Sequence, residues 1–389
     1  MISVSEALHL IKENTGPVKD IIEISAIESA GYVLSQDVIS PVDLPAFDQS
    51  AMDGFAISPH SSERYHLRGE VRAGSSTQFQ LDPGDAVRIF TGARVPESAS
   101  AVVIQEEVVT DGDEICVKSD VSKGMNIRTQ GEQLRTGSVA LSKGMRVNPA
   151  AVGLLVSMGI EKVNVYRKPL TSVIVTGDEL IAPGSVPEPG QIYESNSVVL
   201  VSALHENGFG VISVQHVKDE VSSITDAISA ESKISDLILV SGGVSVGDHD
   251  HTVECLANNG YVKIFHGVDQ KPGKPLYFGI KDDKIAFGLP GNPASALTCF
   301  YVYILPALRS VSGSGFNGKW IRAGLNSTFK KKGAREEFLR AEYSNGIVTL
   351  LPLQNSAMLH NYAKANALVR LPAGKASYES GDPVDVLLL

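Results

Sequence analysis

The chain has 389 residues, 43% hydrophobic and 20% charged, which is typical of a globular protein and too long for a single hydrophobic core. Its net charge of −10 excludes a nucleic-acid coat, so local lysines, arginines and backbone N–H groups must hold any anionic ligand. Three scattered cysteines indicate reduced thiols. With no signal-peptide pattern and no run of about 18 apolar residues, we expect a cytoplasmic protein without a membrane span.

The first half of the chain alternates helical and β-rich patterns. Residues 3–14 predict an amphipathic helix with an N-terminal capping box. Short β-rich runs separated by Gly, Pro, Asp and Ser predict a small β domain at residues 41–130. This domain interrupts a discontinuous N-terminal helical, elongated domain, which we expect to be formed by residues 1–40 and 131–168.

The second half predicts an α/β domain at residues 169–313 and a β domain at residues 314–389. In the first, apolar strands alternate with helices, which indicates a doubly wound, mostly parallel sheet covered on both faces. A long apolar helix from Pro293 to about Val311 closes it. In the second, period-two alternation and the hairpin signal Asn345-Gly346 predict a small β-barrel or sandwich. The fold class is therefore α/β and multidomain.

A glycine-rich segment, SGGVSVGDHD at residues 241–250, follows a predicted strand and precedes a helical pattern. Its glycines allow backbone N–H groups to approach an anion, and the following helix N-terminus adds positive potential. Asp250 is a candidate catalytic carboxylate, and a helix N-cap is its structural alternative. His249 and His251 flank Asp250, but surface or tautomer-fixed histidines are commoner than a metal site with this spacing.

Carboxylates also follow two other predicted strands: Asp178 and Glu179 follow one, and Asp219 and Glu220 follow the next. Ligands of such sheets bind at the carboxyl ends of the strands, so these acids converge with Asp250 at one edge. An oxygen-rich pocket of this kind suits Mg²⁺, which takes one or two carboxylates plus substrate phosphates. Taken singly, Asp219 would be a helix cap and Glu179 a solvated loop residue.

Two lysines, Lys271 and Lys274, lie on the proline-bearing loop KPGKP. Fixed ammonium groups suit an oxyanion or a pyrophosphate, although exposed lysines beside a turn are the structural alternative. The segment LPGNPAS at residues 289–295 predicts a tight turn in which Asn292 or Ser295 caps the next helix. The free N–H groups of this turn are also available to an anion.

Eight motifs in family order resemble the MoeA family of molybdopterin molybdenumtransferases, the bacterial counterparts of the gephyrin E domain. They cover nearly the whole chain: DQSAMDGFA (48–56), FTGARVPESASAVVIQEE (90–107), NIRTQGE (126–132), TGDEL (176–180), QIYESNS (191–197), SGGVSVGDHD, KPGKP and GLPGNPASA (288–296). The resemblance implies four domains, with a MogA-like molybdopterin-binding domain and a C-terminal β-barrel, in an elongated homodimer. It also implies a Mg²⁺-dependent reaction in which adenylylated molybdopterin and molybdate give molybdenum cofactor and AMP.

The resemblance assigns roles to matching positions of this chain. It implies catalytic roles for Asp53, Thr91, Glu179, Asp219 and Asp250, of which Glu179, Asp219 and Asp250 are also the expected Mg²⁺ ligands. With the glycine loop, the expected substrate-binding residues are Gly242, Gly243, Ser245, Gly247, Lys271, Lys274, Pro290, Pro293, Arg335 and Ser356.

Two segments depart from the family pattern: DHDH at residues 248–251 and QNSAMLHNYAKANAL at residues 354–368, where His360 and Tyr362 are larger than expected. They leave open a non-catalytic, gephyrin-like scaffold, which the retained carboxylates oppose. A tungstate-preferring paralogue is a third reading, because the two oxyanions are nearly isosteric. The expected partners are a second copy of the chain, the molybdopterin adenylyltransferase and molybdoenzyme-maturation proteins, with neither nucleic acid nor membrane.

Overall fold

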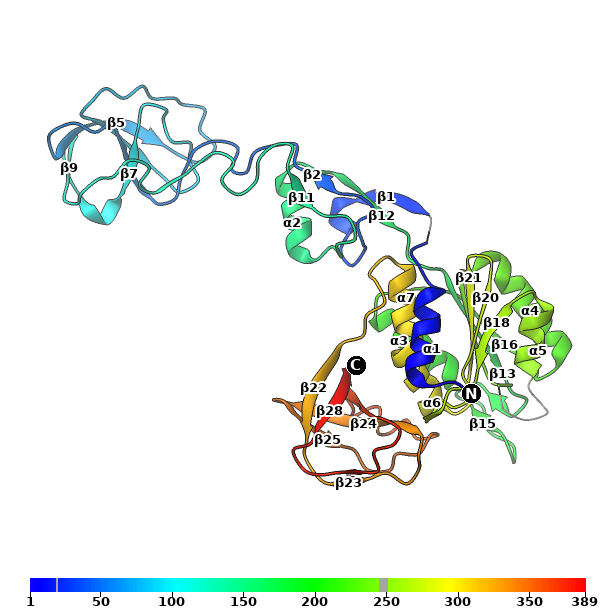
Figure 1. Cartoon of the computed structure of the whole chain (residues 1–389). Helices are drawn as coiled ribbons and strands as arrows, with labels where there is room; N and C mark the ends of the chain where they lie inside the picture. The colour runs from blue at the N-terminus through cyan, green and yellow to red at the C-terminus, as the bar shows by residue number, and fades with distance from the viewer. Residues whose placement is uncertain (19, 245–250) are drawn as a thin grey trace.

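A computed structural model gives the fold and describes residues 1–18, 20–244 and 251–389. The molecule is elongated (Figure 1). A β-rich unit lies at one end, an α/β unit and a β-barrel lie beside each other at the other end, and a narrow unit joins them. The predicted class, α/β with several domains, is confirmed.

The outer β unit (residues 49–128) is a six-stranded sheet in the order β7-β4-β6-β5-β9-β8. Its apolar side chains form two buried clusters, and at its base the short strands β3 and β10 pair. The strands are β3 (Gln49–Ser50), β4 (Gly54–Ile57), β5 (Arg64–Val71), β6 (Asp85–Ile89), β7 (Ala101–Ile104), β8 (Val108–Asp111), β9 (Glu114–Val117) and β10 (Ile127–Arg128), with a 3-10 turn at Gln105–Glu107.

The connecting unit (residues 21–39 and 139–166) forms because the segments before and after the outer β unit pair with each other. Strand β1 pairs antiparallel with β12, and β2 pairs with β11. Asn148 caps α2 by accepting a hydrogen bond from the Ala151 N–H at 2.8 Å. The elements are β1 (Ile21–Ser25), a 3-10 turn (Ala26–Glu28), β2 (Val38–Ile39), β11 (Val139–Leu141), α2 (Pro149–Ser157) and β12 (Lys162–Tyr166).

Helix α1 (Val4–Glu13) begins as predicted, because Ser3 Oγ accepts a hydrogen bond from the Glu6 N–H at 3.1 Å. Its buried face, which includes Val4 and Ile11, packs in the core of the α/β unit. The sequence pattern placed this helix with residues 1–40 of the elongated domain. Amphipathic periodicity identifies which face of a helix is buried but not the surface it packs on.

The α/β unit (residues 171–311) has a six-stranded sheet in the order β16-β13-β17-β21-β20-β18. The first four strands are parallel, as predicted, and β20 pairs antiparallel with both β21 and the edge strand β18. Alternate strand residues point to two cores: one with α1, α3, α6 and α7, the other with α4 and α5. The elements are β13 (Thr171–Thr176), α3 (Asn196–Glu206), β16 (Val211–Val217), α4 (Val221–Ile234), β17 (Leu237–Ser241), α5 (His251–Asn258), β18 (Val262–His266), β20 (Tyr277–Lys281) and β21 (Lys284–Leu289).

The predicted long apolar helix is present and continuous. It consists of α6 (Pro293–Cys299), a π-helical turn (Phe300–Ile304) and α7 (Leu305–Val311). Its length and composition would allow it to cross a membrane, but 89% of its most apolar window is buried inside the protein. It is therefore packed as the core helix of the α/β unit.

The last unit is a closed five-stranded barrel, because β24 pairs with both β25 and β26 while β22 pairs with both β25 and β28. Asn345 and Gly346, with φ of 50° and 83°, form the predicted hairpin turn. Strand β19 (Gln270–Lys271) of the α/β unit pairs with β24 and joins the two units. The remaining strands are β14 (Leu180–Ile181), β15 (Ile192–Tyr193), β22 (Trp320–Leu325), β23 (Phe329–Lys330), β24 (Glu336–Ser344), β25 (Ile347–Leu350), β26 (Ala367–Leu371), β27 (Ser377–Tyr378) and β28 (Pro383–Leu388).

Candidate active site

The loop between β19 and β20 carries the two predicted anion-binding lysines. Lys271 ends β19, which is fixed by its pairing with the barrel strand β24. The buried Gln270 side chain donates hydrogen bonds to Pro272 O at 3.0 Å and Gly273 O at 3.1 Å. Gly273 has φ of 88°, and a Cβ there would lie 2.6 Å from the Cys299 sulfur. The loop is therefore held rigidly from inside by contacts that the sequence did not reveal.

A cavity of about 520 Å³ lies between this loop, the turn before α6 and the barrel. The structure brings five predicted substrate-binding residues together here: Lys271, Lys274, Pro290, Arg335 and Ser356. Its lining contains three cationic side chains, and no described Asp or Glu lies among them. Within a chain of net charge −10, this cavity is a local positive site suited to an oxyanion.

Asn292 joins the two units across the cavity. By position it is the N-cap of α6, but its side chain makes no capping hydrogen bond. Instead, its amide donates to Ser356 Oγ at 3.3 Å. Asn292 therefore occupies the predicted capping position, but its amide faces a hydroxyl of the barrel rather than the first turn of its own helix.

The barrel also contributes amide residues that sequence reasoning missed, Gln354 and Asn355. The fully buried Arg340 holds them: its guanidinium donates to Asn355 O at 3.0 Å, and its backbone N–H donates to Gln354 Oε1 at 2.9 Å. Its other two guanidinium nitrogens have no hydrogen-bond partner in the described part of the chain. Burial lowers the pKa of Arg340. The unusual QNS sequence before His360 was the available signal for these amides.

The start of the glycine loop lies at the end of β17. Gly242 and Gly243 have φ of 100° and 62°, and a Cβ at Gly242 would lie 2.2 Å from Thr176 O. Only glycine fits this close approach of two strand ends. Val244 lines the cavity, whereas Ser245, Gly247 and Asp250 lie outside the described residues.

Asp219 is half-buried where β16 meets α4. Its carboxylate accepts a hydrogen bond from Thr176 Oγ1 at 3.1 Å, and its N–H donates to Asp178 Oδ1 at 3.3 Å. The alternative of a helix cap is wrong, because Glu220 occupies the N-cap position of α4. A Cβ at Gly243 would lie 3.3 Å from Asp219 Oδ1, so this carboxylate borders the glycine loop.

The described residues contain no group of three or more His, Cys, Asp and Glu side chains placed to hold a metal. Of the three expected Mg²⁺ ligands, Asp219 is fixed at a strand end, Glu179 is exposed on the neighbouring loop, and Asp250 falls outside the described part. Mg²⁺ takes as few as one or two carboxylates when substrate phosphates supply the rest, so Asp219 fits one such position.

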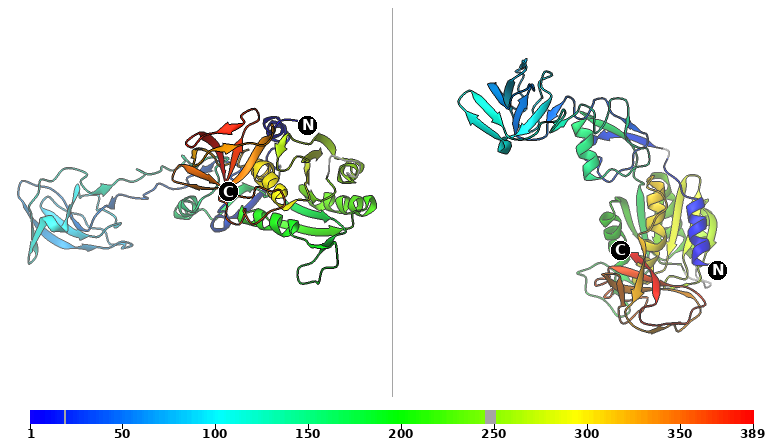
Figure 2. Two further views of the ribbon diagram at one scale, coloured as in Figure 1. Left: turned by 90° about the horizontal axis from the view of Figure 1, so that it is seen from below. Right: turned by 60° about the vertical axis from the view of Figure 1, so that its left-hand side comes forward.

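Asp53 and Thr91 lie together, but in the outer β unit. The backbone N–H and the hydroxyl of Thr91 both donate to Asp53 Oδ1 at 2.7 Å. Both hydrogen bonds lower the pKa of Asp53, and the backbone hydrogen bond has the larger effect. The connecting unit separates the outer β unit from the α/β unit and the barrel, which lie at the other end of the molecule (Figures 1 and 2). A single chain therefore does not bring all the predicted residues together.

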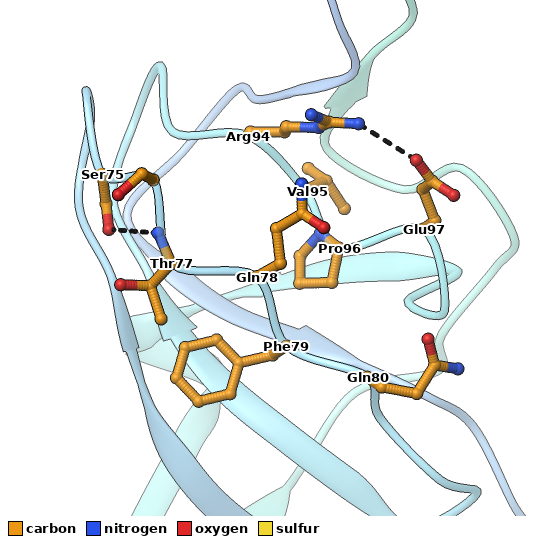
Figure 3. Close-up of a pocket in the computed structure, with 10 residues that line it drawn as sticks. Ser75, Thr77, Gln78, Phe79, Gln80, Arg94, Val95, Pro96 and Glu97 are labelled. Atoms are coloured by element: carbon orange, nitrogen blue, oxygen red, sulfur yellow. Dashed lines mark hydrogen bonds and ion pairs between the residues drawn. The ribbon is translucent and has the colours of Figure 1, made fainter.

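The outer β unit also has a hollow of about 240 Å³ lined by residues 75–80 and 94–97 (Figure 3). Its charged groups are paired, with Arg94 and Glu97 in an ion pair of 3.0 Å, and the Thr77 N–H donates to Ser75 Oγ at 3.1 Å. None of the expected site residues lines it. The cavity beside the barrel is the better candidate.

Three family models match the chain in succession: the MoeA N-terminal region (domain I and II) at residues 2–159, a probable molybdopterin binding domain at 172–310, and the MoeA C-terminal region (domain IV) at 322–389. A molybdopterin molybdenumtransferase of Staphylococcus epidermidis is 33% identical over 100% of this chain and 95% of the relative. The chain belongs to the MoeA family. This confirms the family assignment made from the motifs. It also confirms the prediction that the protein is an enzyme of molybdenum cofactor biosynthesis.

Further relatives and solved structures agree with MoeA membership. A Staphylococcus aureus (strain N315) molybdopterin molybdenumtransferase is 31% identical over 100% of this chain and 95% of that one. The crystal structure of a molybdopterin biosynthesis moeA protein from Pyrococcus horikoshii OT3 is 30% identical and covers 100% of both chains with a TM-score of 0.86. A molybdenum cofactor biosynthesis protein from Pyrococcus furiosus, 18% identical with a TM-score of 0.64 over 100% of both chains, shares the fold.

Proposed function

We propose that this MoeA-family chain transfers molybdenum from molybdate to adenylylated molybdopterin, with release of AMP, in the cavity between the α/β unit and the barrel. The observation that carries the proposal is the convergence of Lys271, Lys274 and Arg335 in a cavity of about 520 Å³. Molybdate and the phosphates of the substrate are anions, and preorganised cations stabilise them without reorganisation during the reaction.

The residues that line this cavity have two different roles in binding the anions. The two lysines and Arg335 supply charge, while Ser356 and Asn292, already 3.3 Å apart, supply neutral donors that orient an oxyanion. The dithiolene sulfurs of the substrate are the soft ligands that molybdenum takes, so the protein needs no thiolate of its own. Burial raises the pKa of Cys299 to about 12 and also raises that of Cys255, in keeping with this division.

We propose Mg²⁺ as the cofactor, held by Asp219 together with Glu179 and Asp250. It would neutralise the substrate's phosphates. The support is Asp219, whose carboxylate is fixed by Thr176 beside the glycine loop. Asp219→Asn removes the charge but keeps the shape, so the Mg²⁺ concentration required for half-maximal activity should rise at least roughly tenfold. An unchanged Mg²⁺ requirement would remove Asp219 from the metal site.

We further propose that the active unit is a homodimer in which Asp53 and Thr91 of one chain complete the cavity of the other. The support is that this pair is preformed, ionised and exposed, yet remote from its own cavity. The proposed location is the cytoplasm, and the enzyme that adenylylates molybdopterin and the proteins that mature molybdoenzymes are the proposed partners.

The test is an assay of the purified protein with adenylylated molybdopterin, Mg²⁺ and molybdate, following AMP release. The proposal expects AMP release that depends on molybdate and that Lys271→Ala reduces, whereas Lys364→Ala, which removes an exposed barrel lysine, leaves it unchanged. Binding of both substrates without AMP release would instead support the scaffold reading. Repeating the assay with tungstate decides the oxyanion preference.

A further inference from the structure

A second cavity, of about 400 Å³, lies where three units meet, and we name it the junction pocket. The connecting unit contributes Tyr32 and Arg146 to its lining. The α/β unit contributes residues 205–209 at the end of α3 and Arg309 on α7, and Lys319, just before β22, comes from the barrel side. The junction pocket shares no lining residue with the candidate active site.

The lining of the junction pocket is strongly basic. Four lysine and arginine side chains line it, Arg146, Lys168, Arg309 and Lys319, against a single carboxylate, Glu206. None of the four forms an ion pair within the described residues. Cations normally gather beside acids in a chain of net charge −10, so an uncompensated group of four requires an explanation.

Lys168 shows most clearly that these charges are not neutralised within the chain. Its ammonium lies 4.5 Å from the centre of the Tyr32 ring, and it makes no hydrogen bond to any described residue. Burial, and then the nearby Arg146, lower the pKa of Lys168, and the same two causes lower the pKa of Arg309. Both shifts are those of partly buried cations that have a like charge nearby, and a bound anion would favour their charged forms.

Stabilisation of helix ends explains only part of this group. Helices α3 and α7 both end at the pocket, and cations favour helix C-termini. However, the Arg309 guanidinium donates to Asn317 O at 2.9 Å, beyond its helix. Arg146, Lys168 and Lys319 belong to neither helix. The helix ends therefore do not account for the three cations that come from outside them.

The space beside the cations is also suited to a ligand. The volume of about 400 Å³ is within the range of small-molecule sites. One phosphate group carries at most about two negative charges, so four cations match a ligand with two phosphate groups.

We propose that the junction pocket is a second anion site, which binds a small molecule carrying two phosphate groups and thereby fixes the connecting unit against the α/β unit and the barrel. The four cations come from three units, so a shared anion would crosslink them. This inference does not depend on the proposed function of the cavity beside the barrel.

The test uses inorganic diphosphate as the probe, with isothermal titration calorimetry on the full chain. A Lys271→Ala/Lys274→Ala background removes the contribution of the candidate active site. We expect one diphosphate site per chain that weakens as salt rises, and we expect Lys168→Gln and Lys319→Gln each to weaken it by roughly fivefold to tenfold. Lys364→Gln, an exposed lysine outside the pocket, is the matched control and should leave the affinity unchanged.

Lys319 is exposed, so Lys319→Gln should keep its thermal unfolding temperature and remain interpretable if Lys168→Gln proves unstable. An unchanged diphosphate affinity in Lys319→Gln, or no diphosphate binding in the background variant, would overturn the proposal. Orthophosphate or molybdate that binds here as tightly as diphosphate would overturn the assignment to a ligand with two phosphate groups.

Discussion

In the outer β unit, two hydrogen bonds of 2.7 Å from Thr91 hold the carboxylate of Asp53, whereas the cavity beside the barrel is lined by cations and amides without a described carboxylate. One end of the chain thus presents a fixed negative charge, and the other end a fixed positive cavity. The connecting unit keeps them apart (Figure 2). The residues expected at one active site are therefore held separately within a chain, each in its own unit.

The largest effect should come from removing the charge of the cavity. Each charge-assisted contact contributes about 1.5–3 kcal/mol, so Lys271→Ala/Lys274→Ala should weaken molybdate binding by roughly 100-fold or more. Calorimetry measures this, and Lys364→Ala, which removes an exposed lysine outside the cavity, should leave molybdate binding unchanged. Equal losses in the two variants would contradict the assignment of the positive cavity as the anion site.

An intermediate effect should follow from Arg340→Met, which removes the buried group that holds Asn355 and so the barrel side of the cavity. The lost hydrogen bonds to the guanidinium destabilise the folded protein, whereas removal of a partly unpaired buried charge stabilises it. The free energy of unfolding should therefore fall by about 1–3 kcal/mol in total. Molybdate affinity should fall with it. In the control Arg322→Met, loss of the exposed ion pair to Asp385 should cost less than about 1 kcal/mol. Chemical denaturation that finds equal losses would contradict a positioning role for Arg340.

The smallest effect concerns Asp53. Its pKa lies below its usual value because the Thr91 N–H and hydroxyl stabilise the ionised form, so the carboxylate stays charged until the pH falls through that lowered pKa. Thr91→Val keeps the N–H and loses the hydroxyl, so the pKa of Asp53 should rise part of the way towards its usual value. An NMR titration of this carboxyl measures the change, and Thr91→Ser should restore the wild-type titration. An identical titration in Thr91→Val would show that the hydroxyl contributes nothing.

The sequence predicted the structural elements that depend on local residue patterns. Periodicity and turn chemistry predicted the parallel sheet, the buried helix from Pro293 to Val311 and the hairpin at Asn345-Gly346, because each depends on residues close in sequence. The partner of α1 was not predictable in this way, because its apolar stripe fits any sufficiently large apolar surface.

Some residues of the candidate site were predictable from the sequence, and others were not. The KPGKP motif indicated Lys271 and Lys274, and the resemblance to the family implied Ser356. The structure brings all three to one cavity. No motif indicated Gln354 or the buried Arg340 beneath it, because neither stands in a pattern typical of a binding site and their hydrogen bonds form only when the chain folds back across 14 residues. Nor does any local pattern give the distance between Asp53 and the cavity, since the intervening unit is built from two separate segments.

Subunit complementation tests whether two chains share each active site. Asp53→Ala chains and Lys271→Ala/Lys274→Ala chains should each be nearly inactive in AMP release. In a mixed dimer one site carries both defects and the other carries neither.

Equal mixing with random exchange makes half of the dimers mixed, so roughly a quarter of wild-type activity should return if the sites act independently. The mixture must be verified by mass spectrometry to have exchanged subunits. Recovery to that level would place Asp53 of one chain at the cavity of the other, whereas verified exchange without any recovery would contradict the shared site.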